Sequence, residues 1–453
     1  MSTRTAANRN VRPTLRADGA PDVVTFLTVY LVLLYAIPSN RVIPAMGSAG
    51  SVSLIWAGGA AILWCLYYIQ RSGPSMPQHS HPIRTAAFAF LTAALVSYAV
   101  AMTRAIPAEE VNTADTGLIR LLAWAGIMLI TIDGLGSFDR FLVFLRRLVA
   151  AGGILAGLGI LQFATRLSFI DLVTIPGLAT GDGYATIETR GGLVRAAGTA
   201  NHPLEYGLVL VMILPFALTL ALREKSRSAL VRWLPVPAIA LALLLSGSRS
   251  ALVGLIVAVV VLIPTWSAAV RWRIGLAAVI LVAVLYVMSP RVVTNLRYLL
   301  FAFNDDPSVS SRTGSLGMVG RVFGLNPIFG RGYGTFLPQY RILDNEYLLL
   351  LIEVGVVGLA AFVALVGVAA CSALLAGRRS HVPVIHDIGY ALAGSVFAGG
   401  VLLALFDGLS FPQAAGTLFV VFGLCGAYWR LNRHYGDYAA PGMLVVARDG
   451  GWM

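Results

Sequence analysis

The chain has 453 residues, of which 58% are hydrophobic and only 12% are charged, and its formal net charge is +12. Soluble domains carry about 25% charged residues, and a soluble fold of this length could not bury so much apolar surface. The composition therefore argues against a soluble protein and favours one that places its apolar helices in a lipid bilayer. In such a protein, excess basic charge is expected in cytoplasmic loops and does not indicate a nucleic-acid partner.

Twelve apolar segments have about the length of a membrane crossing. The sequence thus predicts an all-α, polytopic membrane protein with about 12 transmembrane helices and one larger external loop domain. The twelve segments are residues 22–38, 51–70, 85–103, 117–135, 148–164, 203–222, 231–246, 250–265, 274–289, 346–376, 388–406 and 413–431. The first nine lie within residues 22–289 and the last three within residues 346–431.

The basic residues of the loops predict the orientation of these helices, because cytoplasmic loops collect Arg and Lys. With the N-terminal tail, residues 1–21, on the cytoplasmic side, every expected inside loop carries at least two basic residues. The C-terminal tail, residues 432–453, is then cytoplasmic as well. Residues 290–345 are too polar to span and form the external loop domain. The sequence predicts a multi-pass protein of the inner (cytoplasmic) membrane with both termini inside.

Several arginines lie on the expected outer side of the membrane, against the preference of basic residues for cytoplasmic loops, and therefore need another explanation. The first is Arg195, in the block from Arg195 to Pro203. Gly198 permits a turn, and Pro203 suits the first turn of the helix that follows. Asn201 or His202 can cap that helix. We take Arg195 and His202 as candidate substrate-binding residues. The alternative is a loop that leads into a helix and carries one arginine at the membrane surface.

The second block, residues 246–250, separates two apolar segments by very few residues and contains Arg249. An arginine between two membrane segments is costly unless it faces a partner or a wet cavity. Three serines and Gly247 beside it offer hydroxyl groups and close backbone approach. Arg249 is therefore another candidate for substrate binding, although its side chain could also snorkel to the membrane interface.

The third block combines two arginines with a glycine-rich stretch inside the external loop domain. Arg312 and Arg321 precede residues 326–336, where glycines alternate with other residues. Such glycines permit tight turns and leave backbone N–H groups exposed, so that the stretch can cradle an anion. The pattern is neither a phosphate-binding P-loop nor a dinucleotide-binding fingerprint.

The fourth block lies at the mouth of the long helix predicted at residues 346–376. Asp344, Asn345 and Glu346 form a polar cluster there. Asp344 can either accept a proton or cap the helix. Glu353 lies two turns further into the same apolar segment, where a carboxylate is costly and indicates a specific role.

The fifth block, residues 406–413, is a short polar turn in which Asp407 can pair with an arginine. The expected topology puts all five blocks on one face of the membrane, although they are far apart in the sequence. Their arginines suit a diphosphate, because the planar guanidinium bonds phosphate oxygens in pairs. Together the blocks predict a site for an anionic, lipid-borne substrate that approaches from the outer side of the membrane.

The order and spacing of these blocks resemble those of the O-antigen ligase and polymerase family of bacterial polysaccharide assembly. The matching pieces are Arg195 to Pro203, Ser246 to Ser250 with Arg249, Arg312 with residues 326–336, Asp344 to Tyr347 through Gly355 and Gly358, and residues 406–413. The resemblance implies a glycosyltransferase that takes a glycan from an undecaprenyl-diphosphate-linked donor in the membrane lipid. It implies no nucleotide sugar, no cofactor and no catalytic metal. Ligases of the family transfer the glycan to lipid A core or another surface acceptor, whereas polymerases transfer it to the next lipid-linked repeat.

The resemblance also implies roles for individual residues. The arginines would hold the leaving diphosphate, and a polar residue before the long helix would help to activate the acceptor hydroxyl. The implied catalytic residues are Asp344, Asn345 and Glu346, and the implied substrate-binding residues are Arg195, His202, Arg249, Arg312, Arg321 and Asp407.

One departure from the family bears on the kind of enzyme. Many ligases have His-Asn where this chain has Asp344-Asn345, which favours a polymerase of the exopolysaccharide or O-antigen type and leaves a ligase as the alternative. A transporter or flippase is a second alternative, but it should show charges at the bilayer midplane and paired repeats. A non-catalytic scaffold would not need arginines placed against the charge rule.

Overall fold

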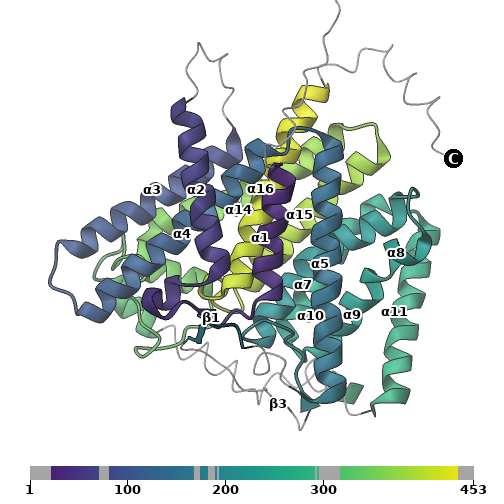
Figure 1. The fold of residues 1–453 in the computed structure, drawn as a ribbon, viewed down its shortest axis with the longest axis horizontal. Coiled ribbons are helices and arrows are strands. Elements are labelled where there is room, and N and C mark those ends of the chain that lie inside the picture. The colour runs from purple at the N-terminus through teal and green to yellow at the C-terminus, as the bar shows by residue number, and fades with distance from the viewer. Residues whose placement is uncertain are drawn as a thin grey trace, which may run out of the picture.

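The computed structural model describes residues 22–70, 81–167, 174–181, 189–190, 193–290, 293–294 and 317–436. In these ranges the protein is a bundle of α-helices (Figure 1). Strands in the described ranges form two short antiparallel pairs, β1 (Arg41–Val42) with β2 (Ala179–Thr180) and β3 (Thr189–Arg190) with β4 (Leu193–Val194). The predicted all-α class is confirmed.

The helices follow the predicted apolar segments, each of which contains at least part of one helix. The labelled α-helices are α1 (Val23–Ala36), α2 (Val52–Gln70), α3 (Pro82–Met102), α4 (Ala108–Gly134), α5 (Phe138–Thr165), α7 (Pro203–Arg223), α8 (Ala229–Trp233), α9 (Pro235–Leu245), α10 (Arg249–Leu262), α11 (Ala268–Met288), α14 (Glu346–Arg379), α15 (Pro383–Leu403) and α16 (Pro412–Gly436). Residues 317–323 form a further short helix. The part of the chain that the structure describes also has three short 3₁₀ helices, η1 (Pro44–Ala49), η2 (Ile263–Thr265) and η3 (Gly408–Ser410).

Nine helices of the described ranges are long and apolar enough to cross a membrane, namely α2, α3, α4, α5, α7, α11, α14, α15 and α16. Helix α1, the α8–α9 pair and α10 with η2 are apolar but shorter. The protein is therefore polytopic, and the expected count of about 12 crossings stays a prediction for the three shorter segments. The external loop domain at residues 290–345 also stays a prediction, because residues 291–292 and 295–316 lie outside the described ranges.

Several helices begin where the sequence supplies a capping residue or a proline. Ser137, Ser248 and Ser267 each accept a hydrogen bond from the N–H group three residues later, at the starts of α5, α10 and α11. These bonds satisfy N–H groups that have no partner within the helix. Pro203 and Pro383 occupy the first turns of α7 and α15, where a missing N–H group costs nothing.

Helix α7 lies at the centre of the bundle, and nearly all its residues are buried. It packs against α5, α10, α15 and α16. Helix α11 lies at the edge of the molecule (Figure 1), and its Trp272 and Val287 are 77% and 80% exposed. Apolar side chains with this exposure suit contact with lipid tails, so α7 belongs to the protein core and α11 to the lipid-facing surface.

The long helix α14 is interrupted at Gly355, whose φ of 66° lies in the left-handed region. The interruption leaves backbone groups of α14 without hydrogen-bond partners inside the helix. The glycine-rich stretch, residues 326–336, supplies these partners. Arg331 N donates to Ile352 O at 2.8 Å, and Val356 N donates to Pro327 O at 2.9 Å. A Cβ atom at Gly355 would lie 2.3 Å from a backbone oxygen of the stretch, so only glycine fits this approach.

N–H groups of the same stretch also bind Glu353 of α14. Glu353 is 5% exposed, and its Oε1 accepts a hydrogen bond from Phe336 N at 3.2 Å. Its backbone oxygen accepts Gly332 N at 2.8 Å and the Ser97 hydroxyl at 2.6 Å. The idea that residues 326–336 offer their N–H groups to a substrate anion is therefore wrong for these groups, because α14 already occupies them.

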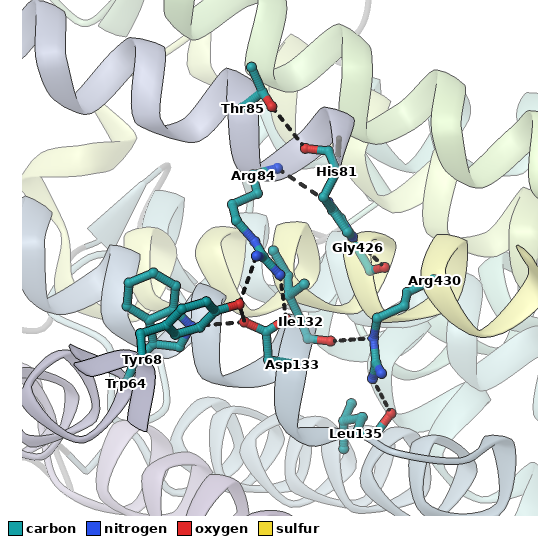
Figure 2. Close-up of polar contacts among 10 residues, drawn as sticks. All are labelled: Trp64, Tyr68, His81, Arg84, Thr85, Ile132, Asp133, Leu135, Gly426 and Arg430. Carbon is teal, nitrogen blue, oxygen red and sulfur yellow. Dashed lines mark hydrogen bonds and ion pairs between the residues drawn. The ribbon is translucent and has the colours of Figure 1, made fainter. Parts of the chain in front are cut away.

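At the end of the bundle that the charge pattern predicts to be cytoplasmic, polar side chains tie three helices together (Figure 2). Asp133 of α4 accepts hydrogen bonds from Arg84 Nη2 at 2.5 Å, Trp64 Nε1 at 2.8 Å and the Tyr68 hydroxyl at 3.3 Å. Arg84 also donates to the Tyr68 hydroxyl at 2.8 Å. Side chains of α2 and α3 thus meet on one carboxylate at the end of α4.

Helix α16 joins the same end of the bundle through Arg430 (Figure 2). Its Nε and Nη2 donate to the backbone oxygens of Ile132 at 3.1 Å and Leu135 at 2.7 Å, at the C-terminus of α4. An arginine satisfies the last carbonyls of a helix in this way. His81, just before α3, lies 3.1 Å from the Gly426 oxygen through its Nε2. Burial lowers the pKa of His81 to about 4, so the ring is neutral at physiological pH.

Candidate functional site

The loop that carries Arg195 is fixed by a buried glutamine of α5. Gln162 Oε1 accepts hydrogen bonds from Ala197 N at 2.9 Å and Gly198 N at 2.8 Å. Gly198 has a φ of 60°, which a residue with a side chain rarely adopts. The loop can therefore turn sharply and present two successive N–H groups to one oxygen.

Arg195 itself is 9% exposed and joins the first predicted block to the second. Its Nε donates to Ser246 O at 2.9 Å, and the neighbouring Ala196 N donates to Leu245 O at 3.2 Å. These bonds fix the direction of the guanidinium group against the turn between α9 and α10. Two arginine-bearing blocks that are separated in the sequence are thus in direct contact.

Arg249 is the first residue of α10 and follows its capping residue, Ser248. The N-terminus of a helix carries partial positive charge, so it favours an anion and disfavours a cation. An arginine at this point adds to the positive potential instead of balancing it. The turn at residues 246–250 therefore carries positive charge from Arg249 in addition to that of the helix end.

His202 caps α7, because its Nδ1 accepts a hydrogen bond from Leu204 N at 3.0 Å. Of the two capping residues that the sequence left open, Asn201 and His202, the structure therefore selects His202. The ring centroid of His202 lies 6.0 Å from that of Phe411. The first block therefore lies beside the turn at residues 406–413.

Asn345, and not Asp344, caps the long helix α14. Asn345 Oδ1 accepts a hydrogen bond from Leu348 N at 3.1 Å, and its Nδ2 donates to Ala404 O at 3.0 Å. The capping alternative for Asp344 is therefore wrong, and its carboxylate is not used in that way. Asp344 has a φ of 47°, a left-handed conformation that costs energy outside glycine and recurs at functional sites.

Asp407 lies close enough to two other candidate residues for their charges to affect it. Burial raises the pKa of Asp407, and the neighbouring carboxylate of Asp344 raises it further, whereas His202 lowers it. The three residues come from separate blocks of the sequence. The structure thus brings Asp344, Asp407 and His202 together.

Glu346 has a defined structural contact. It is 2% exposed, and its Oε2 accepts a hydrogen bond from Leu409 N at 2.9 Å. This bond holds the turn that carries Asp407 against the start of α14. The catalytic roles expected for Glu346 and Asn345 stay predictions, and the contacts of both residues are those of side chains that fix the geometry around Asp344.

Of the two arginines expected from the external loop domain, the structure describes Arg321. Arg321 is exposed, and its Nε donates to Gly317 O at 3.4 Å within its own short helix, residues 317–323. Arg312 lies outside the described residues. Substrate binding by both arginines stays a prediction from the sequence.

Sequence reasoning missed two buried residues that organise the site, Gln162 and Glu205. Each lies in an apolar segment and was treated as part of a membrane helix. A signal for Glu205 was present, because a carboxylate within a membrane-length segment is costly and marks a specific role. Among the described residues, no group of three His, Cys, Asp or Glu side chains is arranged to hold a metal ion.

The fold and these residues define a class, a polytopic helical membrane protein with arginines and carboxylates gathered around loops at one end of its bundle. Residues 234–363 match the family model described as O-antigen ligase. The chain is thus O-antigen ligase-like in this range, which confirms the resemblance seen in the sequence. Arg249 and Asp344 lie inside the matched range, whereas Arg195 and Asp407 lie outside it. The comparison with curated proteins found no match.

Proposed function

We propose that this protein is a membrane glycosyltransferase that polymerises undecaprenyl-diphosphate-linked glycan repeats on the outer face of the cytoplasmic membrane. The O-antigen ligase match supports membrane glycan assembly of the ligase or polymerase type. The observation that carries the proposal is the contact of buried Arg195 with the α9–α10 turn, together with the approach of Asp344 and His202 to Asp407. Such a site combines cations for a diphosphate with carboxylates for an acceptor hydroxyl.

The proposed reaction follows from these two kinds of group. Arg195 and Arg249 hold the diphosphate of the lipid-linked donor, and Asp344 accepts the proton of the acceptor hydroxyl. The hydroxyl oxygen forms a bond to the anomeric carbon, the bond from that carbon to the diphosphate oxygen breaks, and the diphosphate leaves with its lipid. A positioned base contributes about 10² to 10⁴-fold to such a step.

The neighbourhood of Asp344 supports its role as the base. Burial raises the pKa of Asp407, and the Asp344 carboxylate raises it further, so the two carboxylates are close enough to interact. The polymerase is preferred over the ligase because an aspartate stands where many ligases of the family have histidine. We place both termini on the cytoplasmic side, as the loop charges indicate.

Reconstitution of the purified protein in liposomes tests the proposal. A polymerase supplied only with undecaprenyl-diphosphate-linked repeats should produce a ladder of lipid-linked chains. A ligase should consume the donor only when a surface acceptor such as lipid A core is added. Transport of the intact lipid-linked glycan without any new glycosidic bond would identify a flippase. Failure of the parent protein to consume the donor in either mixture would rule out glycan transfer.

A further inference from the structure

The carboxylate of Glu205 lies where three separate parts of the chain meet. Glu205 is completely buried in the first turn of α7. Its Oε2 accepts a hydrogen bond from Asn201 N at 2.8 Å. Its Oε1 accepts hydrogen bonds from Gln413 N at 2.7 Å and from the Ser39 hydroxyl at 3.3 Å. The side chain thereby joins the loop before α7, the start of α16 and the segment after α1.

Hydrogen bonds offset part of the cost of burying the carboxyl group of Glu205. An unpaired buried carboxylate is very costly, and hydrogen-bond donors must offset that cost. Each of the three partners named above donates a hydrogen bond, so both carboxyl oxygens of Glu205 act as acceptors. The carboxylate also lies in the first turn of α7 and accepts from the first turn of α16, where the helix dipoles favour a negative charge.

A second layer of hydrogen bonds reinforces the same junction. Gln413 Nε2 donates to the Thr199 hydroxyl at 3.1 Å, and that hydroxyl donates to Tyr35 O at 2.7 Å. Ser39 N donates to Thr199 O at 3.1 Å. The loop before α7 is therefore fixed both to α16 and to the segment after α1.

The junction lies between the two halves of the proposed site. Asn201, which Glu205 binds, directly precedes His202 in the loop of Arg195, and Gln413 closes the turn that begins near Asp407. The relative position of the loop and the turn thus depends on one carboxylate that bonds to both.

We propose that Glu205 is a positioning residue, which holds the diphosphate-binding loop of Arg195 in register with the turn of Asp407 and with the acceptor-activating Asp344. It acts through these residues and touches no substrate itself. The inference rests on the proposed glycan transfer. A displacement of about 1 Å between reacting groups can cost about 10²-fold in rate, so loss of this junction should lower kcat far more than donor affinity.

The test compares Glu205→Gln with Asp133→Asn in the reconstituted chain-extension assay. Glutamine keeps the size of Glu205, but its NH₂ group faces an N–H donor, so one of the two backbone bonds is lost. Asp133 is a matched control, because it also accepts three hydrogen bonds but lies in the cluster of Arg84, away from the proposed site. Two values are measured for each variant, kcat for chain extension and Kd for polyprenyl diphosphate without a glycan.

We expect Glu205→Gln to lower kcat by about 10²-fold, with the Kd for polyprenyl diphosphate within about threefold of the parent. Asp133→Asn should lower the melting temperature while the folded protein keeps its kcat. If Glu205→Gln does not fold, Ser39→Ala removes only the weakest donor and should lower kcat about 2 to 5-fold with unchanged Kd.

The outcomes separate this inference from the proposed function. A parent protein that extends no glycan overturns the proposed function itself. If the parent is active and Glu205→Gln has the same kcat as Asp133→Asn, the positioning role is overturned. If Glu205→Gln does not fold, a Ser39→Ala variant with the kcat of the parent overturns it instead. A parallel loss of kcat and of polyprenyl diphosphate binding would make Glu205 part of the binding site and also overturn it.

Discussion

At the scale of single residues, the sequence leaves open whether Asp344 caps α14 or accepts a proton, and the structure assigns the cap to Asn345. Asn345 caps α14 and bonds Ala404 O, so its side chain is committed to structure. Asp344 precedes the cap in a left-handed conformation, near Asp407. Since the cap does not depend on Asp344, its carboxylate can be changed without unfolding the start of the helix.

The change Asp344→Asn should therefore lower chain extension by about 10² to 10⁴-fold, the usual contribution of a general base, and leave the melting temperature close to that of the parent. Asparagine tolerates a positive φ better than other residues with a side chain, so the backbone is not strained. Extension from lipid-linked repeats and thermal unfolding in detergent measure the two effects. Near-parental extension by this variant would refute the base and move the search to Asp407.

Arg249 provides a second residue-scale prediction, because it adds a cation at a helix N-terminus. If it binds diphosphate through its planar fork, Arg249→Ala should lower kcat/KM by about 10 to 10²-fold, as expected for a lost bond to a charged group. Arg249→Lys should recover only part of this loss, since an ammonium group cannot form the paired bonds. Arg273→Lys on exposed α11 is the control and should match the parent. An Arg249→Lys variant as active as the parent would exclude paired binding at this residue.

At the scale of elements, the interruption of α14 fixes the glycine-rich stretch. Gly355 must adopt a positive φ and lets the backbone at Ile328 approach to a distance that no Cβ would allow. Gly367 lies in the same helix with nothing within 4 Å of its Cβ position. A side chain is therefore excluded at Gly355 but can be accommodated at Gly367.

Gly355→Ala should lower the free energy of unfolding by at least about 1–2 kcal/mol from the left-handed backbone alone, with the steric clash adding to the loss. Gly367→Ala should raise it by about 0.5–1 kcal/mol, because alanine is the better helix former. Thermal unfolding of both variants in the same detergent compares them directly. Equal stability of the two variants would show that the interruption at Gly355 does not constrain the fold.

At the scale of the whole molecule, the orientation in the membrane decides whether the site can meet a substrate from outside. The loop charges predict that both termini lie in the cytoplasm and that residues 290–345 lie outside. In a background without the three native cysteines, a membrane-impermeant thiol reagent applied to whole cells should label Ser308→Cys and spare Ser80→Cys. Labelling of position 80 alone would reverse the orientation and put the site on the cytoplasmic side.

Much of the fold follows from local signals in the sequence. Membrane-length apolar segments predict helices because backbone groups in lipid must bond within their own segment, and Ser248 or Pro203 mark helix starts through local chemistry. The sequence was thus enough to predict a membrane protein. It was also enough to predict that the blocks of Arg195, Arg249, Asp344 and Asp407 lie on the same face of the membrane. For the shorter α1, α8–α9 and α10, the predicted membrane crossings stay predictions, because these helices have fewer residues than the nine longer ones.

Other features depend on which helices pack together, and only the tertiary structure decided them. The roles of Glu205, Gln162 and Glu353 come from hydrogen bonds to backbone groups far away in the sequence, which no local pattern encodes. The same holds for the choice of Asn345 over Asp344 as cap, since both residues can cap a helix by type. The sequence by itself determined the class of protein and the polar blocks, because these depend on composition and periodicity. The partner of each buried polar group was decided by long-range packing.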